Sequence, residues 1–134
     1  MKKYLFFDVD GTLYNEDKVI PASTLEALDL ARRNGHEIAI ATGRAPFMIK
    51  NLLQELDIHT YVCFNGQYVV YNNEVVFTDG VSNETLTKLV DFAGERNEPV
   101  VFLSDDQMVA TKGEREEIEV SLGSLKFPYP SIDA

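Results

Sequence analysis

Short apolar runs alternate with helical patterns over the first 65 residues, and this alternation limits the possible folds more than any other feature of the chain. Three of these runs end in turn residues and predict strands at 3–8, 37–41 and 61–64. Apolar residues at helical spacing predict helices between the strands, at 22–34 and 46–56. A strand–helix repeat of this kind is typical of a parallel sheet with crossover helices. The sequence therefore predicts an α/β protein.

The ends of the predicted helices carry local signals. Ser23 and Glu26 have the spacing of a capping box, in which each side chain satisfies a free backbone N–H group. Gly35 follows the first helix and can end it in a left-handed conformation. Pro46 suits the first position of the second helix, because proline has no N–H group to leave unpaired there.

The second half of the chain has a different pattern, with hairpins in place of alternating strands and helices. The expected elements are hairpin strands at 67–71 and 74–78, a helix at 83–96, hairpin strands at 100–103 and 108–112, a helix at 113–122 and an irregular end at 127–130. Asn72–Asn73 and Asp105–Asp106 are the predicted hairpin turns. We therefore expect a boundary between an α/β unit at 1–80 and an α+β unit at 81–134.

Composition and charge exclude several classes of protein. Of the 134 residues, 45% are apolar and 25% are charged, as in an ordinary globular domain. No apolar stretch approaches the about 20 residues of a membrane span, and the N-terminus lacks the pattern of a signal peptide. A net charge of −10 disfavours nucleic acid as a partner, since lysine and arginine make most phosphate contacts. The one cysteine, Cys63, is expected to be an inert core thiol, and we expect a cytoplasmic protein of undetermined oligomeric state.

Two carboxylates, Asp8 and Asp10, follow the first apolar run directly, and Gly11 and Thr12 come next. If the chain stays extended, strand alternation puts both acids on one side at the carboxyl end of the strand, where open α/β sheets bind ligands. Neighbouring acids repel each other unless a cation or hydrogen bonds compensate. A plain surface turn explains Asp10 and Gly11 well, but it explains poorly a second acid pressed against an apolar strand. The pair therefore predicts a functional site.

The segment from Asp8 to Thr12, Asp-Val-Asp-Gly-Thr, resembles the first motif of the haloacid dehalogenase-like phosphatases. The resemblance implies that Asp8 is the nucleophile, which becomes an aspartyl-phosphate, and that Asp10 is the acid/base with a raised pKa. It also implies an Mg²⁺ ion held by the Asp8 side chain and the Asp10 backbone carbonyl, since Mg²⁺ takes oxygen ligands. Gly11 and Thr12 would then bind the phosphoryl group, which the backbone at a glycine can approach closely.

A second candidate is the segment Thr42-Gly43-Arg44, which follows the second predicted strand. A helix cap would account for Thr42 alone, whereas a phosphate site would use its hydroxyl and the Gly43 N–H beside a helix start. The segment resembles the family's second motif, in the form typical of the Cof-type branch, and the two motifs occur in the expected order. Arg44 is expected to touch the substrate or to order the loop.

Asn65 and Gly66 end the third predicted strand. A turn explains both residues. Cof-type proteins often have Asn-Gly-Ala at this place, where this chain has Gln67, and this resemblance implies that Asn65 binds phosphate or orders the site. The sequence leaves both interpretations open.

The resemblance extends along the whole chain but reaches only to about the middle of a complete family member. It implies the N-terminal part of a Rossmann-like parallel sheet core and the beginning of an inserted α+β cap domain; the later lysine motif and Gly-Asp motif are missing. We therefore expect part of an Mg²⁺-dependent phosphatase that hydrolyses a small phosphorylated metabolite, inactive alone. The alternatives are a phosphoryl-transfer mutase with the same first motif and a non-catalytic binding or assembly fragment. A receiver domain would need an acceptor aspartate after 61–64, where the chain has Asn65.

Overall fold

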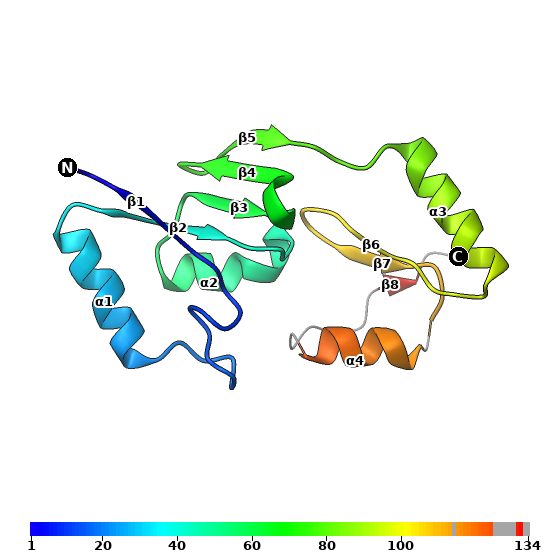
Figure 1. Ribbon diagram of the computed structural model, residues 1–134, viewed down its shortest axis with the longest axis horizontal. Coiled ribbons are helices and arrows are strands. Elements are labelled where there is room, and N and C mark those ends of the chain that lie inside the picture. The colour runs from blue at the N-terminus through cyan, green and yellow to red at the C-terminus, as the bar shows by residue number, and fades with distance from the viewer. Residues whose placement is uncertain (114, 125–130, 133–134) are drawn as a thin grey trace. The chain divides into compact units, whose positions relative to one another are not determined.

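The computed structural model describes residues 1–113, 115–124 and 131–132 (Figure 1). The chain forms two compact units. The first comprises Met1–Arg44 and Ile49–Asp79, and the second comprises Ala45–Met48 and Gly80–Ala134. The assignment of 1–80 to a core domain and of 81–134 to a cap domain stays a prediction.

One sheet of five strands forms the first unit, all of whose residues are described. The strands are β1 (Tyr4–Phe7), β2 (Glu37–Ala41), β3 (Tyr61–Cys63), β4 (Tyr68–Tyr71) and β5 (Glu74–Thr78). They lie in this order across the sheet, in which β1, β2 and β3 are parallel and β4 and β5 add an antiparallel hairpin (Figure 1). The carboxyl ends of the three parallel strands therefore meet at one edge of the sheet. The predicted α/β fold with a parallel core is confirmed.

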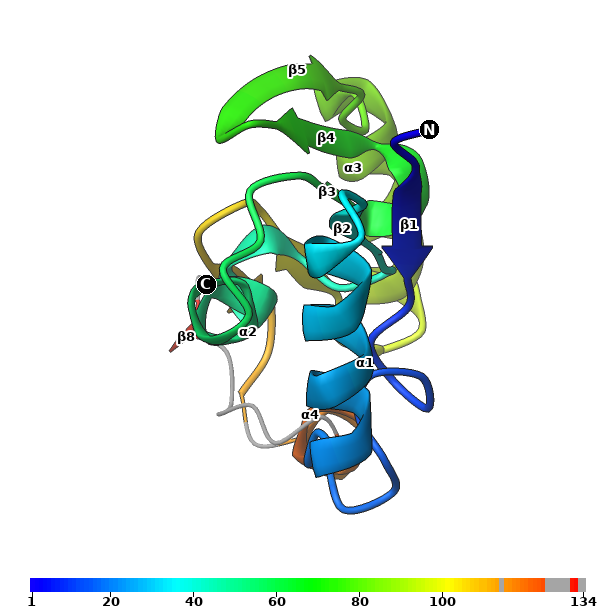
Figure 2. The same cartoon turned by 90° about the vertical axis from the view of Figure 1, so that its left-hand side faces the viewer.

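Helical segments connect the parallel strands. The first connection contains α1 (Ala22–Arg33), which packs along β2 (Figure 2). The second contains the short 3₁₀ helix η1 (Pro46–Ile49) and then α2 (Lys50–Glu55). The single helix predicted at 46–56 is thus divided, because Ile49 leaves the α conformation with a φ of −112°.

The two ends of α1 differ in how well the sequence predicts them. The helix begins at Ala22, so Ser23 lies within its first turn, and no side-chain cap is present. The backbone carbonyl of Pro21 accepts the Thr24 N–H at 3.0 Å instead, and the predicted capping box is wrong. The left-handed end is confirmed, since Gly35 has a φ of +82°.

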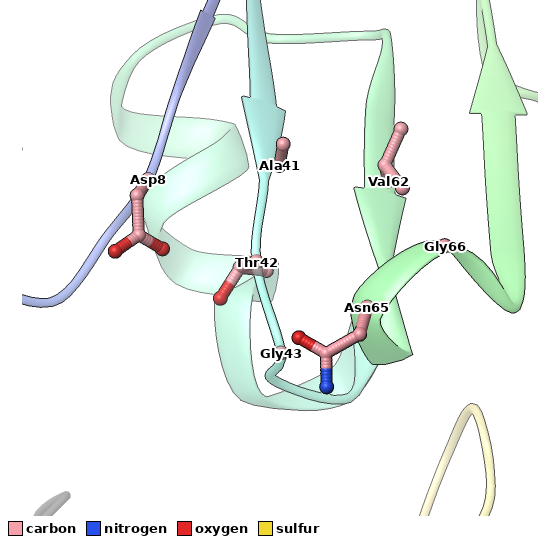
Figure 3. Close-up of a pocket in the computed structure, with 7 residues that line it drawn as sticks. All are labelled: Asp8, Ala41, Thr42, Gly43, Val62, Asn65 and Gly66. Carbon is pink, nitrogen blue, oxygen red and sulfur yellow. The ribbon is translucent and has the colours of Figure 1, made fainter.

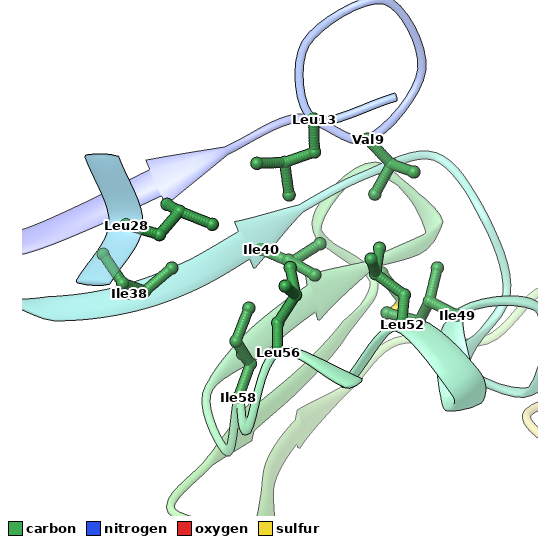
Figure 4. Packing of buried hydrophobic residues seen from close by; sticks show 10 residues of the cluster. Val9, Leu13, Leu28, Ile38, Ile40, Ile49, Leu52, Leu56 and Ile58 are labelled. Atoms are coloured by element: carbon green, nitrogen blue, oxygen red, sulfur yellow. The ribbon is translucent and has the colours of Figure 1, made fainter. Parts of the chain in front are cut away.

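A cluster of buried apolar side chains forms the core of the first unit (Figure 4). It consists of Val9, Leu13, Leu28, Ile38, Ile40, Ile49, Leu52, Leu56, Ile58 and Cys63. Leu5 and Phe7 of β1 pack against this cluster, whereas the alternate residues Tyr4 and Phe6 are 41% and 54% exposed. Only one face of β1 is therefore covered within the described part of the chain. Burial raises the pKa of Cys63 to about 12, so it offers no thiolate for catalysis.

The second unit combines helices and a small sheet. Its elements are α3 (Asn83–Glu95), β6 (Val101–Leu103), β7 (Met108–Ala110), α4 (Glu116–Ser124) and β8 (Ser131–Ile132). The predicted helices and the hairpin of β6 and β7 are confirmed, and Asp106 accepts the Ser104 hydroxyl in the turn at 2.7 Å. The strand β8, which pairs in parallel with β7, is absent from the prediction. The segment 127–130 lies outside the described residues. No described helix has the length and apolar character needed to cross a membrane.

Candidate active site

The chain turns back on itself directly after β1. Gly11 has a left-handed φ of +79°, its N–H donates to the Tyr14 carbonyl at 3.0 Å, and the Tyr14 N–H donates to the Val9 carbonyl at 2.9 Å. A Cβ atom at Gly11 would meet nothing within 4 Å, so the turn requires glycine for its conformation and not for space. Strand alternation would put Asp8 and Asp10 on one side only if the chain stayed extended through Asp10, and this condition is not met, because β1 ends at Phe7 and this bonded loop follows.

Two cations hold the Asp10 carboxylate. Arg44 donates from Nε to Oδ2 and from Nη2 to Oδ1, both at 2.7 Å, and Lys18 donates from Nζ to Oδ1 at 2.6 Å. The hydrogen bonds from Arg44 are the largest cause that lowers the pKa of Asp10 to about 2; partial burial raises it, and Lys18 lowers it further. The expectation of a raised pKa is therefore wrong for this geometry, because the two cations favour the ionised form by more than burial disfavours it.

Arg44 connects the ends of the three parallel strands. Its side chain is only 7% exposed. Its backbone N–H donates to Thr42 Oγ1 at 3.1 Å, and its carbonyl accepts the Phe64 N–H at 3.2 Å. The guanidinium carbon lies 5.9 Å from the centre of the Tyr14 ring, on the loop after β1. These are contacts that order the loops; a contact between Arg44 and a substrate stays a prediction.

Thr42 is buried, and its hydroxyl caps no helix. The hydroxyl oxygen accepts the N–H of Arg44, which precedes the first helical residue, Pro46. The helix α2 begins without a side-chain cap. Since the Thr42 oxygen acts as an acceptor here, its O–H proton is available to a ligand.

Asn65 lies close to Gly43 because the chain takes an uncommon conformation at the end of β3. Phe64 and Asn65 have left-handed φ values of 50° and 55°, and the Asn65 N–H donates to the Thr42 carbonyl at 3.2 Å. A Cβ atom at Gly43 would lie 3.0 Å from Asn65 Oδ1. Gly43 therefore leaves the space that the Asn65 amide occupies.

The strand ends line a cavity of about 500 Å³ in the first unit (Figure 3). Its lining residues are Asp8, Ala41, Thr42, Gly43, Val62, Asn65 and Gly66. The Asp8 carboxylate has no hydrogen-bond partner among the described residues, and in Figure 3 it projects toward the same end of the strands as the Thr42 hydroxyl. The structure thus brings four predicted site residues to one cavity. Gly11 and Thr12 are exposed in the loop and do not line it, and Asp10 and Arg44 do not line it either.

The sequence did not indicate Lys18, which falls in a polar stretch between β1 and α1. Its side chain reaches Asp10 because residues 8–14 fold back and bring the two residues together. The only local signal is a lysine eight positions after the acid, and this spacing has no meaning without the fold of the loop.

The donor atoms near Asp8 suit a hard metal ion only in part. Among the described residues, no group of three or more histidine, cysteine, aspartate and glutamate side chains could hold a metal. Asp10 and Tyr14 form an isolated parallel β-bridge. Its two hydrogen bonds use the Gly11 N–H and the Val9 carbonyl, so the Asp10 carbonyl takes no part in them. This carbonyl and the Asp8 carboxylate are oxygen donors of the kind that Mg²⁺ accepts, and Mg²⁺ keeps several waters where protein ligands are few.

The close approach of Asn65 to Gly43 leads to a testable result. In Gly43→Ala the new methyl group is expected to displace the Asn65 side chain, because it would lie 3.0 Å from Oδ1. The end of a side chain can move at little cost, so we expect a loss of stability below about 1 kcal/mol. The measurement is the NMR signal of the Asn65 side-chain amide, together with a melting curve. Gly80→Ala is the matched control, since a Cβ atom there meets nothing within 4 Å. An Asn65 signal that is unchanged in Gly43→Ala would contradict this geometry.

Comparisons with known proteins identify the family of the chain. The chain matches the haloacid dehalogenase-like hydrolase family over residues 5–132. It is 41% identical to the curated protein named "Putative phosphatase YkrA" of Bacillus subtilis (strain 168), over 98% of this chain and 51% of that protein. The solved structure of a hypothetical protein from Geobacillus kaustophilus HTA426 is similar with a TM-score of 0.91 and 41% identity, over 99% of this chain and 52% of that one.

A further solved structure, named as a sugar phosphatase of haloacid dehalogenase subclass IIB, has a TM-score of 0.82 and 30% identity, over 100% of this chain and 53% of that one. The chain spans about half the length of curated relatives that it matches, covering 51% of the protein named "Putative phosphatase YkrA" and 45% of another Bacillus subtilis phosphatase. The match over residues 5–132 covers nearly all of the chain, which therefore belongs to the family of haloacid dehalogenase-like hydrolases.

Proposed function

We propose that this chain carries the nucleophile of a phosphatase that hydrolyses a small phosphate monoester through an aspartyl-phosphate. The observation that supports this most is the Asp8 carboxylate, which is unpaired among the described residues and lines the same cavity as Thr42. An unpaired carboxylate can attack phosphorus, and the Thr42 O–H can donate to a phosphoryl oxygen. The relatives named as phosphatases support the same reaction class.

The proposed reaction has two steps. In the first, an Asp8 oxygen bonds to phosphorus while the bond from phosphorus to the leaving oxygen breaks, and Asp10 gives that oxygen a proton. In the second, water attacks the phosphorus of the aspartyl-phosphate, Asp10 takes the proton of the water, and inorganic phosphate leaves with Asp8 restored. The ionised Asp10 described above is the form that the second step requires. The first step requires its protonated form, so substrate must weaken the ion pairs with Arg44 and Lys18.

The proposal includes an Mg²⁺ ion held by the Asp8 carboxylate and the Asp10 backbone carbonyl. When bound, the ion neutralises negative charge where a carboxylate and a phosphoryl group would otherwise repel each other.

We also infer that the substrate is a small phosphorylated metabolite, because a neighbouring structure is named as a sugar phosphatase. A cytoplasmic location completes the proposal; it rests on a composition with one cysteine.

One observation favours a second candidate, a non-catalytic part that assembles with another polypeptide segment. Tyr4 and Phe6 expose their rings on the uncovered face of β1, and Val76 and Phe77 of β5 are more than half exposed. Exposed apolar surface of this kind marks a binding face in many proteins. A phosphatase assay separates the two candidates. A non-catalytic protein would hydrolyse no phosphate ester, either as the 134-residue chain or as part of a longer polypeptide.

We use "full-length protein" for a polypeptide that contains these residues and has the length of the relatives. The full-length protein is expected to hydrolyse p-nitrophenyl phosphate in the presence of Mg²⁺, and the 134-residue chain alone is expected to stay at background. The reason is that positioning and charge neutralisation dominate phosphoryl transfer, and the chain holds only part of the required groups. The measurement is the specific activity of both forms at equal Mg²⁺. Equal activities would refute the expected inactivity of the short form, and an inactive full-length protein would refute the phosphatase itself.

A further inference from the structure

The five-stranded sheet has one face on which no helix of the first unit packs. Ile38 and Ile40 of β2 belong to the same buried cluster as Leu28 of α1 and Leu52 of α2, so both helices cover one face. Alternation along the strands and the register between them place other side chains on the opposite face, which we call the open face. Its middle is formed by Tyr4, Phe6, Ala39, Val69, Tyr71 and Phe77. Parallel sheets are almost always covered on both faces, so the open face is a candidate for contact with another protein surface.

Aromatic side chains lie along the open face. The strands β2 and β3 separate β1 from β4, which corresponds to about 14 Å across the sheet. The ring centres of Tyr4 on β1 and Tyr71 on β4 are nevertheless only 6.3 Å apart, and their hydroxyl groups form a hydrogen bond of 3.0 Å. Both rings therefore lean over the middle strands, where Ala39 of β2 is fully buried. The rings make this surface flat, and a flat surface suits another flat surface better than a small ligand.

The rings of the open face remain accessible to water. Tyr4 is 41% exposed, Phe6 is 54% exposed, Tyr71 is 45% exposed and Phe77 is 51% exposed. Apolar surface gains free energy when it leaves water, and contiguous exposed patches of it mark interaction surfaces in many proteins. The rings from β1 and from β4 and β5 thus form an apolar surface across the width of the sheet.

Charged side chains lie at the border of the open face. Glu37 on β2 forms an ion pair with Lys2 at 2.8 Å, Glu74 is the first residue of the edge strand β5, and Asp8 follows β1. A surface that covers the middle of the face leaves these groups in water, which is favourable because a buried unpaired charge is costly. The net charge of −10 makes two copies of the chain repel each other at long range, but salt screens this repulsion.

The open face has the size of a weak interface. Its five strands, about 4.8 Å apart and about 13 Å long, span roughly 20 Å by 13 Å. Protruding rings make the accessible area larger than this outline, so we expect two such faces to bury about 1,000 Å² in total, in the size range of weak and reversible complexes. A contact of this size predicts dissociation in the micromolar range.

We propose that a second copy of this chain docks on the open face, so that two sheets pack face to face about a two-fold axis. Sheets packed in this way lie about 10 Å apart with their strands about 30° from parallel, and the axis brings the same residues together from both copies. A single helix is about 10 Å wide and would cover about half of the face, whereas a second open face covers all of it. The aromatic rings of the two copies then pack against each other.

Analytical ultracentrifugation of the 134-residue chain between about 5 μM and about 500 μM tests the proposal. We expect a monomer–dimer equilibrium. Phe6→Lys and Phe77→Lys, on opposite sides of the face, are each expected to raise the dissociation constant at least about tenfold, because each puts a charge into an apolar contact. Leu30→Lys is the matched control, since it makes the same change of charge at a residue of α1 that is 60% exposed. It is expected to match the unsubstituted chain, and circular dichroism checks that each variant folds.

Two further measurements need no substitution. Raising the salt concentration from about 0.05 M to about 0.5 M is expected to lower the dissociation constant several-fold, because it screens the repulsion between two acidic copies. The NMR signals of the Tyr4 and Tyr71 rings are expected to shift with protein concentration.

Five results would overturn the dimer: a monomer at every concentration, a dimer that resists both lysine substitutions on the face, an equal loss in Leu30→Lys, a dimer that salt weakens, or tyrosine signals that do not shift. The first would leave the open face to another polypeptide segment. The second would indicate pairing through a sheet edge, such as that of β5.

Discussion

Asp8→Asn is expected to abolish turnover in the full-length protein, with kcat reduced by about 10⁴-fold or more. The amide oxygen of asparagine is a far poorer nucleophile than a carboxylate, so no aspartyl-phosphate can form. The substitution is nearly isosteric. Because the Asp8 carboxylate has no partner among the described residues, we expect stability to change by less than about 1 kcal/mol. The measurements are steady-state hydrolysis of p-nitrophenyl phosphate and a melting curve of each variant.

Asp29→Asn is the matched control for this experiment. Asp29 lies on α1, is exposed, and within the described part of the chain pairs only with Arg33 on the surface. The control makes the same chemical change outside the cavity, and its activity is expected to stay at the wild-type level. Hydrolysis by Asp8→Asn clearly above a mock-purified preparation would show that the nucleophile is another group.

Removal of metal is expected to have the second large effect. Dialysis of the full-length protein against EDTA should lower its activity at least about 100-fold, and added Mg²⁺ should restore it, because a divalent ion offsets several kcal/mol of charge repulsion in such a site. The 134-residue chain is expected to bind Mg²⁺ only weakly, since it offers one carboxylate and one carbonyl. Calorimetric titration of the chain and of its Asp8→Asn variant measures this binding. Full activity in excess EDTA would exclude the metal from the reaction.

The sequence predicts well the strands and turns that are determined by their own residues. The predicted strand 37–41 coincides with β2 (Glu37–Ala41), because hydrophobic patterning alone marks a buried strand. The turn at Asn72–Asn73 has φ values of 48° and 66° at its two central residues, which asparagine tolerates better than most residues. The missed strand β8 is two residues long and exists only through its pairing with β7. Nothing in so short a segment distinguishes it from a loop.

The features of the candidate site also differ in how well the sequence predicts them. The polar residues that end the parallel strands could be foreseen, because strands of one direction bring their ends to one edge of the sheet. The state of Asp10 could not, since it depends on Arg44, 34 positions away, and on Lys18 across a folded loop. Resemblance suggested a carboxyl group that holds its proton, whereas the geometry around Asp10 favours the charged form. Electrostatics of this kind depend on distances between side chains, which spacing in the sequence does not determine.

The buried guanidinium of Arg44 limits which combinations of residues can occur around it. Because the Arg44 side chain binds Asp10 and the Arg44 backbone N–H binds the Thr42 hydroxyl, substitutions at Asp10 and Thr42 are not independent of Arg44. Residues that share a partner show effects that do not add. A change at Asp10 leaves a buried positive charge without its carboxylate, so variants that alter both residues together should be tolerated better than either alone. Epistasis, more than the individual worth of each residue, then governs which combinations a mutational library or a diverging lineage can retain at this end of the sheet.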